Sequence, residues 1–384
     1  MDFSFTEQQQ EIFDAVAEIC ADFKARARET NAAGKFPWDN VRIMAECDLF
    51  GIPVPEQWGG MGLGFLEWAV VGEMLSHACT TTGAVYAAHM LCLYPILAFG
   101  TDEQKDKFLR PLATGEKIGA MGLTEPGVGS DAGSVQTRAE RRGDSYVLNG
   151  SKIFITNGGD AEIYVIIANT APGRGTRGLT AFIVEKGTPG FSFGKNEKKM
   201  AYDSLSNCEL IFEDCEIPAS NLLYKEGRGF RVAMELLDVG RIGMAVGAVG
   251  LAQAAYEAAV QYSLQREQFG QKIHEFQAIQ HFLADMATDI ECARLLAYKA
   301  AWMKDQGLEF TKIAAMAKLF GSEAVNRVCA KAVQIHGGHG YTAEFDVERY
   351  FREAKLFEIV EGTSEIQRNV IAVNLVREAI AATQ

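Results

Sequence analysis

The position of proline along the chain limits the possible folds more than any other feature. All nine prolines lie at or before Pro218. Because proline removes a backbone donor and clashes with the preceding turn, its absence from the rest of the chain permits long helices. Apolar residues there recur at steps of three and four, as at Ile279, Leu283 and Met286, which is the period of one helix face. We therefore expect residues 226–384 to form a helical domain in which about four antiparallel helices make a bundle.

The rest of the chain divides into a helical part and a β-rich part. Residues 1–115 carry helical periodicity, and the sequences TEQQ and TDEQ, which begin at Thr6 and Thr101, have the spacing of capping boxes. From 116 to 225, short runs rich in β-branched and aromatic residues alternate with turn residues, as in a small β-sandwich or barrel. The pair Asn149-Gly150 predicts a hairpin turn there. The expected fold is therefore α+β, with an N-terminal all-α domain, a middle β domain and a C-terminal four-helix bundle.

The charge and the cysteine content exclude several classes of protein. The net charge of −13 argues against nucleic acid or an anionic membrane as the main partner, since neither attracts an acidic surface. The eight cysteines form no C-x-x-C pair and the six histidines form no H-x-x-x-H pair. We therefore expect reduced cysteines, no metal site and a cytoplasmic location. The start of the chain has neither the basic nor the apolar region of a signal peptide. The sequence contains no uninterrupted apolar run of about 18 residues, so we expect no membrane span.

One carboxylate near the end of the chain is placed unusually. Glu361 follows an apolar run, and Gly362 after it supplies a turn that other residues adopt only with strain. Thr363 or Ser364 is then placed to cap the next helix. A carboxylate held on such a turn loses solvation, so its pKa should rise towards the range in which it can accept a proton. The alternative interpretation is a surface glutamate ahead of an ordinary helix cap.

This segment is one of five that together resemble the acyl-CoA dehydrogenases, flavoenzymes that oxidise acyl-CoA thioesters to 2-enoyl-CoA. The segments follow the family's order, and the resemblance spans essentially the whole chain. They are LTEPGVGSD at 123–131, KIFITNG at 152–158, REQFG at 266–270, QIHGGHGY at 334–341 and IVEGTSEIQ at 359–367. The resemblance implies the same three-part fold, FAD as the cofactor and a homotetramer built as a pair of dimers.

The flavin contacts follow from the resemblance alone, because the usual nucleotide motifs give no support. The sequence contains one G-x-G-x-x-G motif, at residues 173–178. It leads into a β-rich run rather than a helix, so we interpret it as a polar loop between strands. The implied FAD contacts are Met121, Leu123, Thr124, Gly129, Ser130, Phe154, Ile155, Thr156, Arg266, Phe269, Gln277, Gln334, Ile335, Gly337, Gly338, Thr363 and Glu365. Those from Arg266 to Gly338 would bind the FAD of a neighbouring subunit. On the residues alone, the alternative for Phe154 is a place in the core of a plain β-strand, and Gly337-Gly338 could equally be a helix C-cap.

The resemblance also implies the base and the substrate contacts. Glu361 would remove the α-proton, since Gly240 stands where a minority of relatives place the catalytic glutamate. The implied substrate contacts are Ser130, Asp238, Arg241, Met90, Leu91, Val360 and Gly362. Val360 replaces a tyrosine that is common in short- and medium-chain members, and the apolar Met90 and Leu91 offer no partner for a charge. We therefore expect a branched or cyclic acyl group rather than a slim straight chain or a dicarboxylate.

The implied function is FAD-dependent α,β-dehydrogenation of an acyl-CoA thioester, with hydride passing to flavin N5 and electrons passing on to an electron-transferring flavoprotein. Two related activities stay open from the sequence. One is a flavin oxidase or monooxygenase that uses O2, and the other is an enoyl-CoA reductase that runs the reaction in reverse. A non-catalytic helical scaffold is the alternative from a different class, and such a protein would purify without flavin colour.

Overall fold

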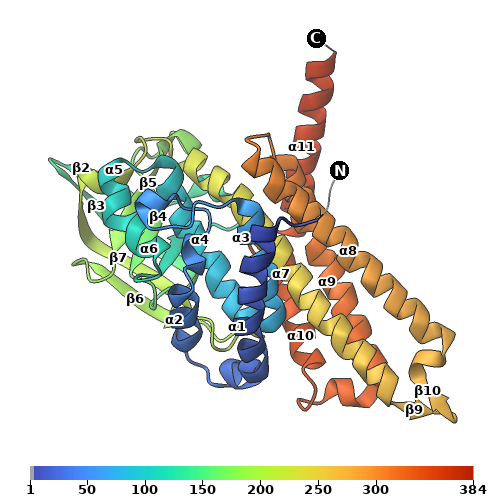
Figure 1. The fold of residues 1–384 in the computed structure, drawn as a ribbon. Coiled ribbons are helices and arrows are strands. Elements are labelled where there is room, and N and C mark those ends of the chain that lie inside the picture. The colour runs from blue at the N-terminus through green and yellow to red at the C-terminus, as the bar shows by residue number, and fades with distance from the viewer. Residues whose placement is uncertain (1–3, 384) are drawn as a thin grey trace.

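Helices from the two ends of the chain pack on a β-sheet formed by its middle. The computed structural model describes residues 4–383, so the first residues of the segment that we judged not to be a signal peptide lie outside the described part. The helices are α1 Glu7–Ala32, α2 Trp38–Glu46, α3 Phe65–Ala78, α4 Thr80–Phe99, α5 Asp102–Gln104, α6 Arg110–Ala113, α7 Gly229–Gln265, α8 Gln277–Asp305, α9 Thr311–His336, α10 Val347–Ala354 and α11 Ser364–Ala382. The sheet lies on the left of Figure 1 and α7, α8 and α9 on the right.

The helices begin where the sequence places their caps. Thr6 Oγ1 accepts a hydrogen bond from the Gln9 amide at 3.2 Å, and the Gln9 side chain accepts one from the Thr6 amide at 2.8 Å. The same reciprocal pair joins Thr101 and Gln104, so both capping boxes are confirmed. In the proline-free part, α7, α8 and α9 run for 37, 29 and 26 residues and pack side by side. The long helices and the bundle are therefore confirmed as well.

The middle of the chain forms one continuous sheet that folds onto itself. Its strands are β1 Gly119–Gly122, β2 Arg138–Arg142, β3 Ser145–Thr156, β4 Ile163–Asn169, β5 Leu179–Glu185, β6 Phe191–Asn196, β7 Asn207–Pro218 and β8 Leu222–Leu223. They pair in the order β6-β7-β3-β2-β4-β5-β8, with β1 parallel to β4. The ring of Tyr164 on β4 lies 5.0 Å from that of Phe191 on β6, and Tyr146 on β3 lies 4.9 Å from Phe182 on β5. Strands distant in the sheet order thus face each other across a core, as expected of a small sandwich or barrel.

The prediction of a hairpin turn at Asn149-Gly150 is wrong. These residues lie inside β3, where the pairing with β7 shifts register between Leu148 and Gly150, so the glycine forms a bulge. Its φ is +138°, and a Cβ atom there would lie 2.8 Å from Cα of Thr137. Glycine is therefore needed for the close approach of two backbones rather than for a chain reversal. The chain reverses instead at Gly143, between β2 and β3.

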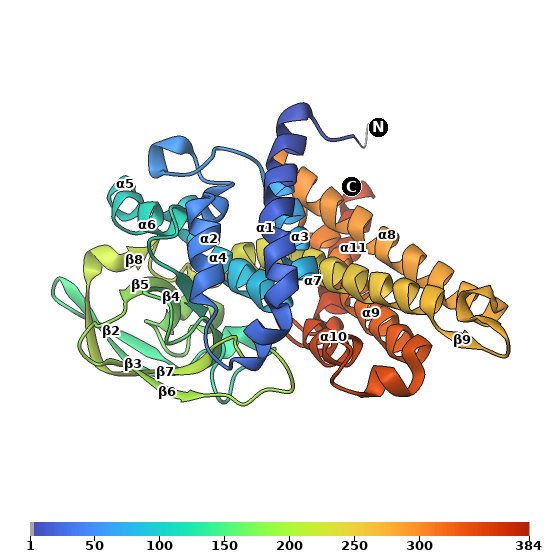
Figure 2. The same ribbon diagram turned by 60° about the horizontal axis from the view of Figure 1, so that its bottom comes forward.

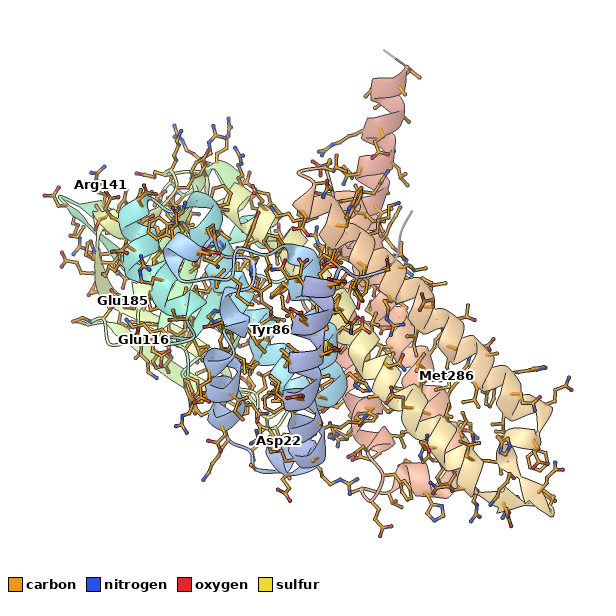
Figure 3. All side chains as sticks on the ribbon, viewed as in Figure 1. Asp22, Tyr86, Glu116, Arg141, Glu185 and Met286 are labelled. Carbon is orange, nitrogen blue, oxygen red and sulfur yellow. The ribbon has the colours of Figure 1, made fainter. Side chains whose placement is uncertain are left out.

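Two hydrophobic cores hold the molecule together, and Figure 3 labels one residue of each. Tyr86 belongs to the core shared by the N-terminal helices, the sheet and the first part of α7, whereas Met286 belongs to the core at the far end of the bundle. Figure 2 shows α2, α4 and α6 over one side of the sheet, with α7, α8 and α9 extending away from it. Within residues 4–383, α4 alone is long and apolar enough to cross a membrane, with a mean hydropathy of 1.4, but 72% of that window is buried inside the protein.

The last helix projects from the rest of the molecule. In Figure 1, α11 carries the C-terminus away from the body of the protein. Only Ser364 and Gln367, in its first turn, are buried. Further along, Val373, Val376 and Ile380 are 48%, 58% and 53% exposed. Their spacing puts them on one helix face, so α11 presents an uncovered apolar stripe.

Candidate active site

Glu361 sits on a strained turn between a short 3-10 helix at Lys355–Glu358 and α11. Its φ is +53°, and that of Gly362 is +91°. Glycine adopts such a conformation freely, but for a glutamate it is unfavourable and persists only where the surroundings impose it. The sequence pointed to the turn through Gly362, but the strain in Glu361 itself was missed.

Side chains from two helices hold this turn. Nε2 of Gln367 donates to the carbonyl oxygens of Glu361 and Gly362 at 3.2 and 2.9 Å, and Nζ of Lys318 donates to the Gly362 oxygen at 2.7 Å. Thr363 caps α11 by accepting a hydrogen bond from the Ile366 amide at 3.3 Å, so the predicted cap is confirmed at Thr363. The turn is thus fixed from α9 and from the first turn of α11.

The Glu361 carboxyl group is removed from water. Its Oε2 atom is buried and has no hydrogen-bond partner among residues 4–383. Burial raises the pKa of the Glu361 carboxyl to about 7, although the charges of Lys318 and Arg241 lower it. The rise expected from the sequence is confirmed. A carboxylate with such a pKa near neutral pH is suited to taking up a proton.

The two helices that carry predicted substrate contacts, α4 and α7, lie next to this carboxyl group. A side chain on Gly240 would meet both Glu361 and Leu91, so α7, α4 and the Glu361 turn converge there. Nη1 of Arg241 donates to Asp238 Oδ1, and Asp238 Oδ2 accepts a hydrogen bond from Thr311 Oγ1 at 2.6 Å. Of the remaining predicted contacts, Met90 is buried and Val360 is partly buried. Ser130 belongs to the β-domain loop.

The segment 121–130, which starts in β1 and continues as this loop, is tied to β3 by a buried ion pair. Nζ of Lys152 donates to Glu125 Oε1 at 2.7 Å and to the Leu123 oxygen at 3.1 Å. The Thr124 oxygen accepts from the Ile153 amide at 2.9 Å. Met121 and Thr124 are partly exposed, and Gly129 and Ser130 are exposed. Apart from the chain neighbours, no atom of residues 4–383 lies within 4 Å of a Cβ atom built on Gly127 or Gly129, so a ligand can approach this backbone closely.

Phe154 lies on β3 beside the loop with its ring exposed. It has a φ of +60° and is 58% exposed, although Ile155 next to it is buried. The pairing of β3 with β7 shifts register between Lys152 and Ile155, and this bulge turns the ring out of the sheet. The alternative of a phenylalanine in the strand core is wrong. An outward aromatic plate next to partly exposed Thr156 fits a flat heteroaromatic ring.

The remaining predicted flavin contacts lie at the far end of the bundle. Arg266 follows the last residue of α7, and Gly337, with φ +60°, follows α9. A hollow there is lined by Tyr262, Arg266, Gln268, Ile273, Ile335, His336, Gly337, Gly338, His339 and Thr342. Phe269, Gln277 and Gln334 are exposed outside this lining. An arginine beside glycine backbone suits phosphate oxygens.

One chain does not bring the two groups of predicted flavin contacts together. Arg241 and Arg266 are joined by continuous helix, and a rise of about 1.5 Å per residue puts them about 37 Å apart. Figure 1 places β9 Glu267–Gln268 and β10 Gln271–Lys272 at the end of the bundle opposite the sheet.

Comparison with known proteins decides the family. Three domain families match in order: "Acyl-CoA dehydrogenase, N-terminal domain" over residues 6–116, the middle domain over 120–215 and the C-terminal domain over 227–376. The chain belongs to the acyl-CoA dehydrogenase family. It is an oxidoreductase that dehydrogenates acyl-CoA thioesters. The three-part fold expected from the sequence is the fold of this family.

Relatives match along nearly their whole length. The short-chain specific acyl-CoA dehydrogenase of Clostridium acetobutylicum is 47% identical, over 98% of this chain and 100% of the relative. The acryloyl-CoA reductase (NADH) of Anaerotignum propionicum is 46% identical, over 97% and 95%. The acyl-CoA dehydrogenase family thus includes close relatives named for opposite directions of reaction.

Solved structures of the family agree with the fold. A chain from structural work on the electron transferring flavoprotein of Acidaminococcus fermentans matches with a TM-score of 0.97 and 50% identity, over 98% of this chain and 100% of that one. PigA, solved with FAD and proline, matches with a TM-score of 0.91 and 31% identity, over 98% and 99%. Members of the family therefore bind FAD in this fold.

Some residues at the site were missed from the sequence. Lys318 and Gln367 hold the Glu361 turn, and Lys152 with Glu125 holds the 121–130 loop. A signal for Lys318 was present, because it is a charged residue within the small and apolar residues 313–321 of a helix. No group of three or more His, Cys, Asp or Glu side chains in the described part of the chain is arranged to hold a metal ion.

Proposed function

We propose that Glu361 is the base that removes the α-proton of the acyl-CoA thioester. The observation that carries the proposal is a buried carboxyl group, with a pKa of about 7, held on a strained turn beside α4 and α7. The backbone N–H of Glu361 donates to no acceptor within residues 4–383. It is therefore available to stabilise negative charge on the thioester oxygen, as in other preorganised oxyanion sites.

FAD is the proposed cofactor, and when bound it would accept the β-hydrogen as hydride. Met121 would line it from β1, Leu123, Thr124, Gly129 and Ser130 from the loop after β1, and Phe154, Ile155 and Thr156 from β3. Thr363 and Glu365 would approach it from the start of α11. The open backbone at Gly129 and the outward ring of Phe154 support this arrangement.

The test of the base is Glu361→Gln, which keeps the size of the side chain and removes its basicity. The variant should retain flavin, while acyl-CoA no longer bleaches the flavin absorbance, and turnover should fall by at least about 10²–10⁴-fold. Glu323→Gln is the matched control, because Glu323 pairs with Arg368 on the surface and should leave turnover unchanged. Near-wild-type turnover of Glu361→Gln would contradict the assignment.

For the substrate, we propose a short acyl chain on CoA, held by Arg241 with Asp238 and walled by Met90, Leu91, Val360 and Gly362. The short-chain specific relative supports the length. The branched or cyclic group expected from Val360 stays a prediction. Comparing kcat/KM for butyryl-, isobutyryl-, cyclohexanoyl-, octanoyl- and glutaryl-CoA tests both points. If a tyrosine in place of Val360 does not penalise the wide substrates, the argument from pocket width fails.

As electron acceptor, we propose an electron-transferring flavoprotein, in line with the structural neighbour from Acidaminococcus fermentans. Oxygen consumption would indicate an oxidase or monooxygenase instead. The NADH-dependent acryloyl-CoA reductase among the relatives favours testing the reverse direction as well. Reduction of an enoyl-CoA in the presence of NADH, at a rate above that of acyl-CoA oxidation, would assign the reductive direction.

We further propose a homotetramer, a pair of dimers, in which Arg266, Phe269, Gln277, Gln334, Ile335, Gly337 and Gly338 reach the flavin of a neighbouring subunit. The distance along α7 between Arg241 and Arg266 supports this, since a single chain does not close the site. The domains assigned to 1–115, 116–225 and 226–384 would each contribute to that site.

The cytoplasmic location stays a prediction; it is compatible with eight free cysteines, six of them buried.

A further inference from the structure

Lys318 on α9 is a fully buried lysine at the centre of the candidate active site. It is 0% exposed, and the small residues one turn away on either side of it, Ala314, Ala315, Gly321 and Ser322, are buried as well. Its ammonium group donates to the Gly362 carbonyl at 2.7 Å. No carboxylate in the described part of the chain lies within 4.0 Å of that ammonium group. Burying such a charge is costly, so a specific reason for it is expected.

A second buried lysine in the same protein shows what an ordinary structural pair looks like. Lys152 is also 0% exposed, but it is matched by Glu125 at 2.7 Å, and that carboxylate also accepts the amides of Gln136 and Thr137 at 2.6 and 2.9 Å. Lys318 has no such partner. Glu361 is the charge that acts most strongly on Lys318, and its Oε2 atom is buried without a partner in residues 4–383.

We propose that Lys318 is a positioning residue for Glu361. Lys318 fixes the strained turn through the Gly362 carbonyl and supplies the positive charge that favours the ionised form of the Glu361 carboxyl group. The inference rests on the proposed role of Glu361 as the base. It explains why a lysine is buried in a helix that otherwise presents small residues to the site. It also explains how a glutamate with positive φ is held in place.

The charged groups around the turn make Lys318 the main counter-charge. Glu361 is faced by Lys318 from α9 and by Arg241 from α7. Arg241 is already neutralised by its ion pair with Asp238. Lys318 in turn feels Glu361, Arg241, Glu358 and Glu365, but Glu358 pairs with Lys355 at the surface. Removing the Lys318 charge should therefore act chiefly on Glu361.

The sign of the effect follows from the charges. A nearby cation favours the ionised form of a carboxyl group, and an ion within about 4–6 Å changes its pKa by about 1–3 units. Because the base must be ionised to accept a proton, kcat/KM falls on the acid side of the Glu361 pKa. Without the Lys318 charge, that acid limb should move to higher pH.

The experiment compares pH profiles of kcat/KM for the flavin-loaded wild type, Lys318→Met and Lys318→Arg. The acid limb of Lys318→Met should move up by about 1–3 pH units, whereas Lys318→Arg keeps the charge and should keep the limb, with a lower kcat because the guanidinium does not fit the same hydrogen bond. Lys331→Met is the matched control, since Lys331 lies on the same helix and pairs with Asp285 at the surface. Its profile should follow that of the wild type.

An unmoved acid limb in folded Lys318→Met would overturn the inference, because a merely structural lysine would lower stability and rate equally at every pH. If Lys318→Met does not fold, Lys318→Arg decides, and an acid limb displaced in that charged variant overturns the inference. Failure of the proposed function is distinguishable: Glu361→Gln would then retain turnover. An inactive Glu361→Gln together with an unmoved limb in Lys318→Met refutes only the role of Lys318.

Discussion

The carboxyl group of Glu361 fills the space that a side chain on Gly240 would occupy, although the two residues are far apart in the chain. A Cβ atom built on Gly240 would lie 2.1 Å from Oε2 of Glu361, far closer than non-bonded atoms approach. The next contact of that Cβ atom would be Leu91 Cδ2 at 2.8 Å. A side chain at position 240 would therefore require the Glu361 carboxyl group to move from its present position.

Gly240→Ala should therefore displace Glu361 and lower kcat. Overpacking of this kind costs about 1–3 kcal/mol of folding stability. In a Glu361→Gly background, the same substitution should cost much less, since the clashing carboxyl group is gone. The check is a double-mutant cycle on thermal stability, with a coupling of about 0.5–3 kcal/mol expected. Additive effects of the two substitutions would mean that the groups do not compete for space.

The pKa of Glu361 also predicts how stability depends on pH. The folded protein keeps this proton up to about pH 7, whereas the ordinary value is 4.5. The folded state therefore binds more protons between these values, and stability falls as pH rises through this window. Glu361→Gln removes the effect, so its stability advantage over the wild type should grow to about 2–4 kcal/mol at pH 8, at ~1.4 kcal/mol per pKa unit. Thermal unfolding at pH 5 and pH 8 measures this, and an equal difference at both would refute it.

Trp68 is predicted to limit the length of the acyl chain. A Cβ atom on Gly243, one turn along α7 from Gly240, would lie 2.9 Å from Cη2 of Trp68 and 3.6 Å from Cβ of Ala87. The indole, which stacks on Tyr86 with ring centroids 5.9 Å apart, thus lies between α4 and α7, one turn along α7 from the position that faces Glu361. Trp68→Ala should open this space and raise the ratio of kcat/KM for octanoyl-CoA over butyryl-CoA by at least about 10-fold.

The control for Trp68 is Trp58→Ala, because Trp58 is partly exposed in the short 3-10 helix Glu56–Trp58, where the Arg110 guanidinium lies 5.9 Å from its ring. That variant should leave the substrate ratio unchanged. Should Trp68→Ala fold, bind flavin and still prefer butyryl-CoA to the same degree, the limit on chain length lies elsewhere.

The apolar stripe on α11 predicts the contact that holds subunits together. Val376 is 58% exposed and shares a helix face with Val373 and Ile380. Val376→Asp should place a charge in that contact and dissociate the assembly, whereas Val376→Thr, of similar shape, should not. Because the flavin site is proposed to be closed by a second subunit, flavin should be lost together with dissociation. Sedimentation velocity recorded at a flavin wavelength tests both, and a fully flavinated monomer would contradict the proposal.

Local signals predicted the ends of helices and the turn at Glu361 correctly. Thr6, Thr101 and Thr363 cap helices as expected, because a cap depends on residues within one turn of the chain. The Asn149-Gly150 pair shows where a local signal fails. Its glycine serves a close approach to Thr137, and the sequence of the pair contains no information about that neighbour. The placement of Lys318, Gln367 and Trp68 depends in the same way on contacts between distant segments.

The sequence by itself determined the order of helical and β-rich parts, the caps and the segment that carries Glu361, because periodicity and turn chemistry act over a few residues. Only the tertiary structure decided that the carboxyl Oε2 atom of Glu361 is buried, beside Gly240 and within the influence of the Lys318 charge. It also decided that Phe154 faces outward, and that Arg266 lies 25 residues along α7 from Arg241, in a hollow that Ile335, Gly337 and Gly338 also line. These properties depend on how whole helices pack, and burial and charge, which set the pKa of Glu361, arise from that packing.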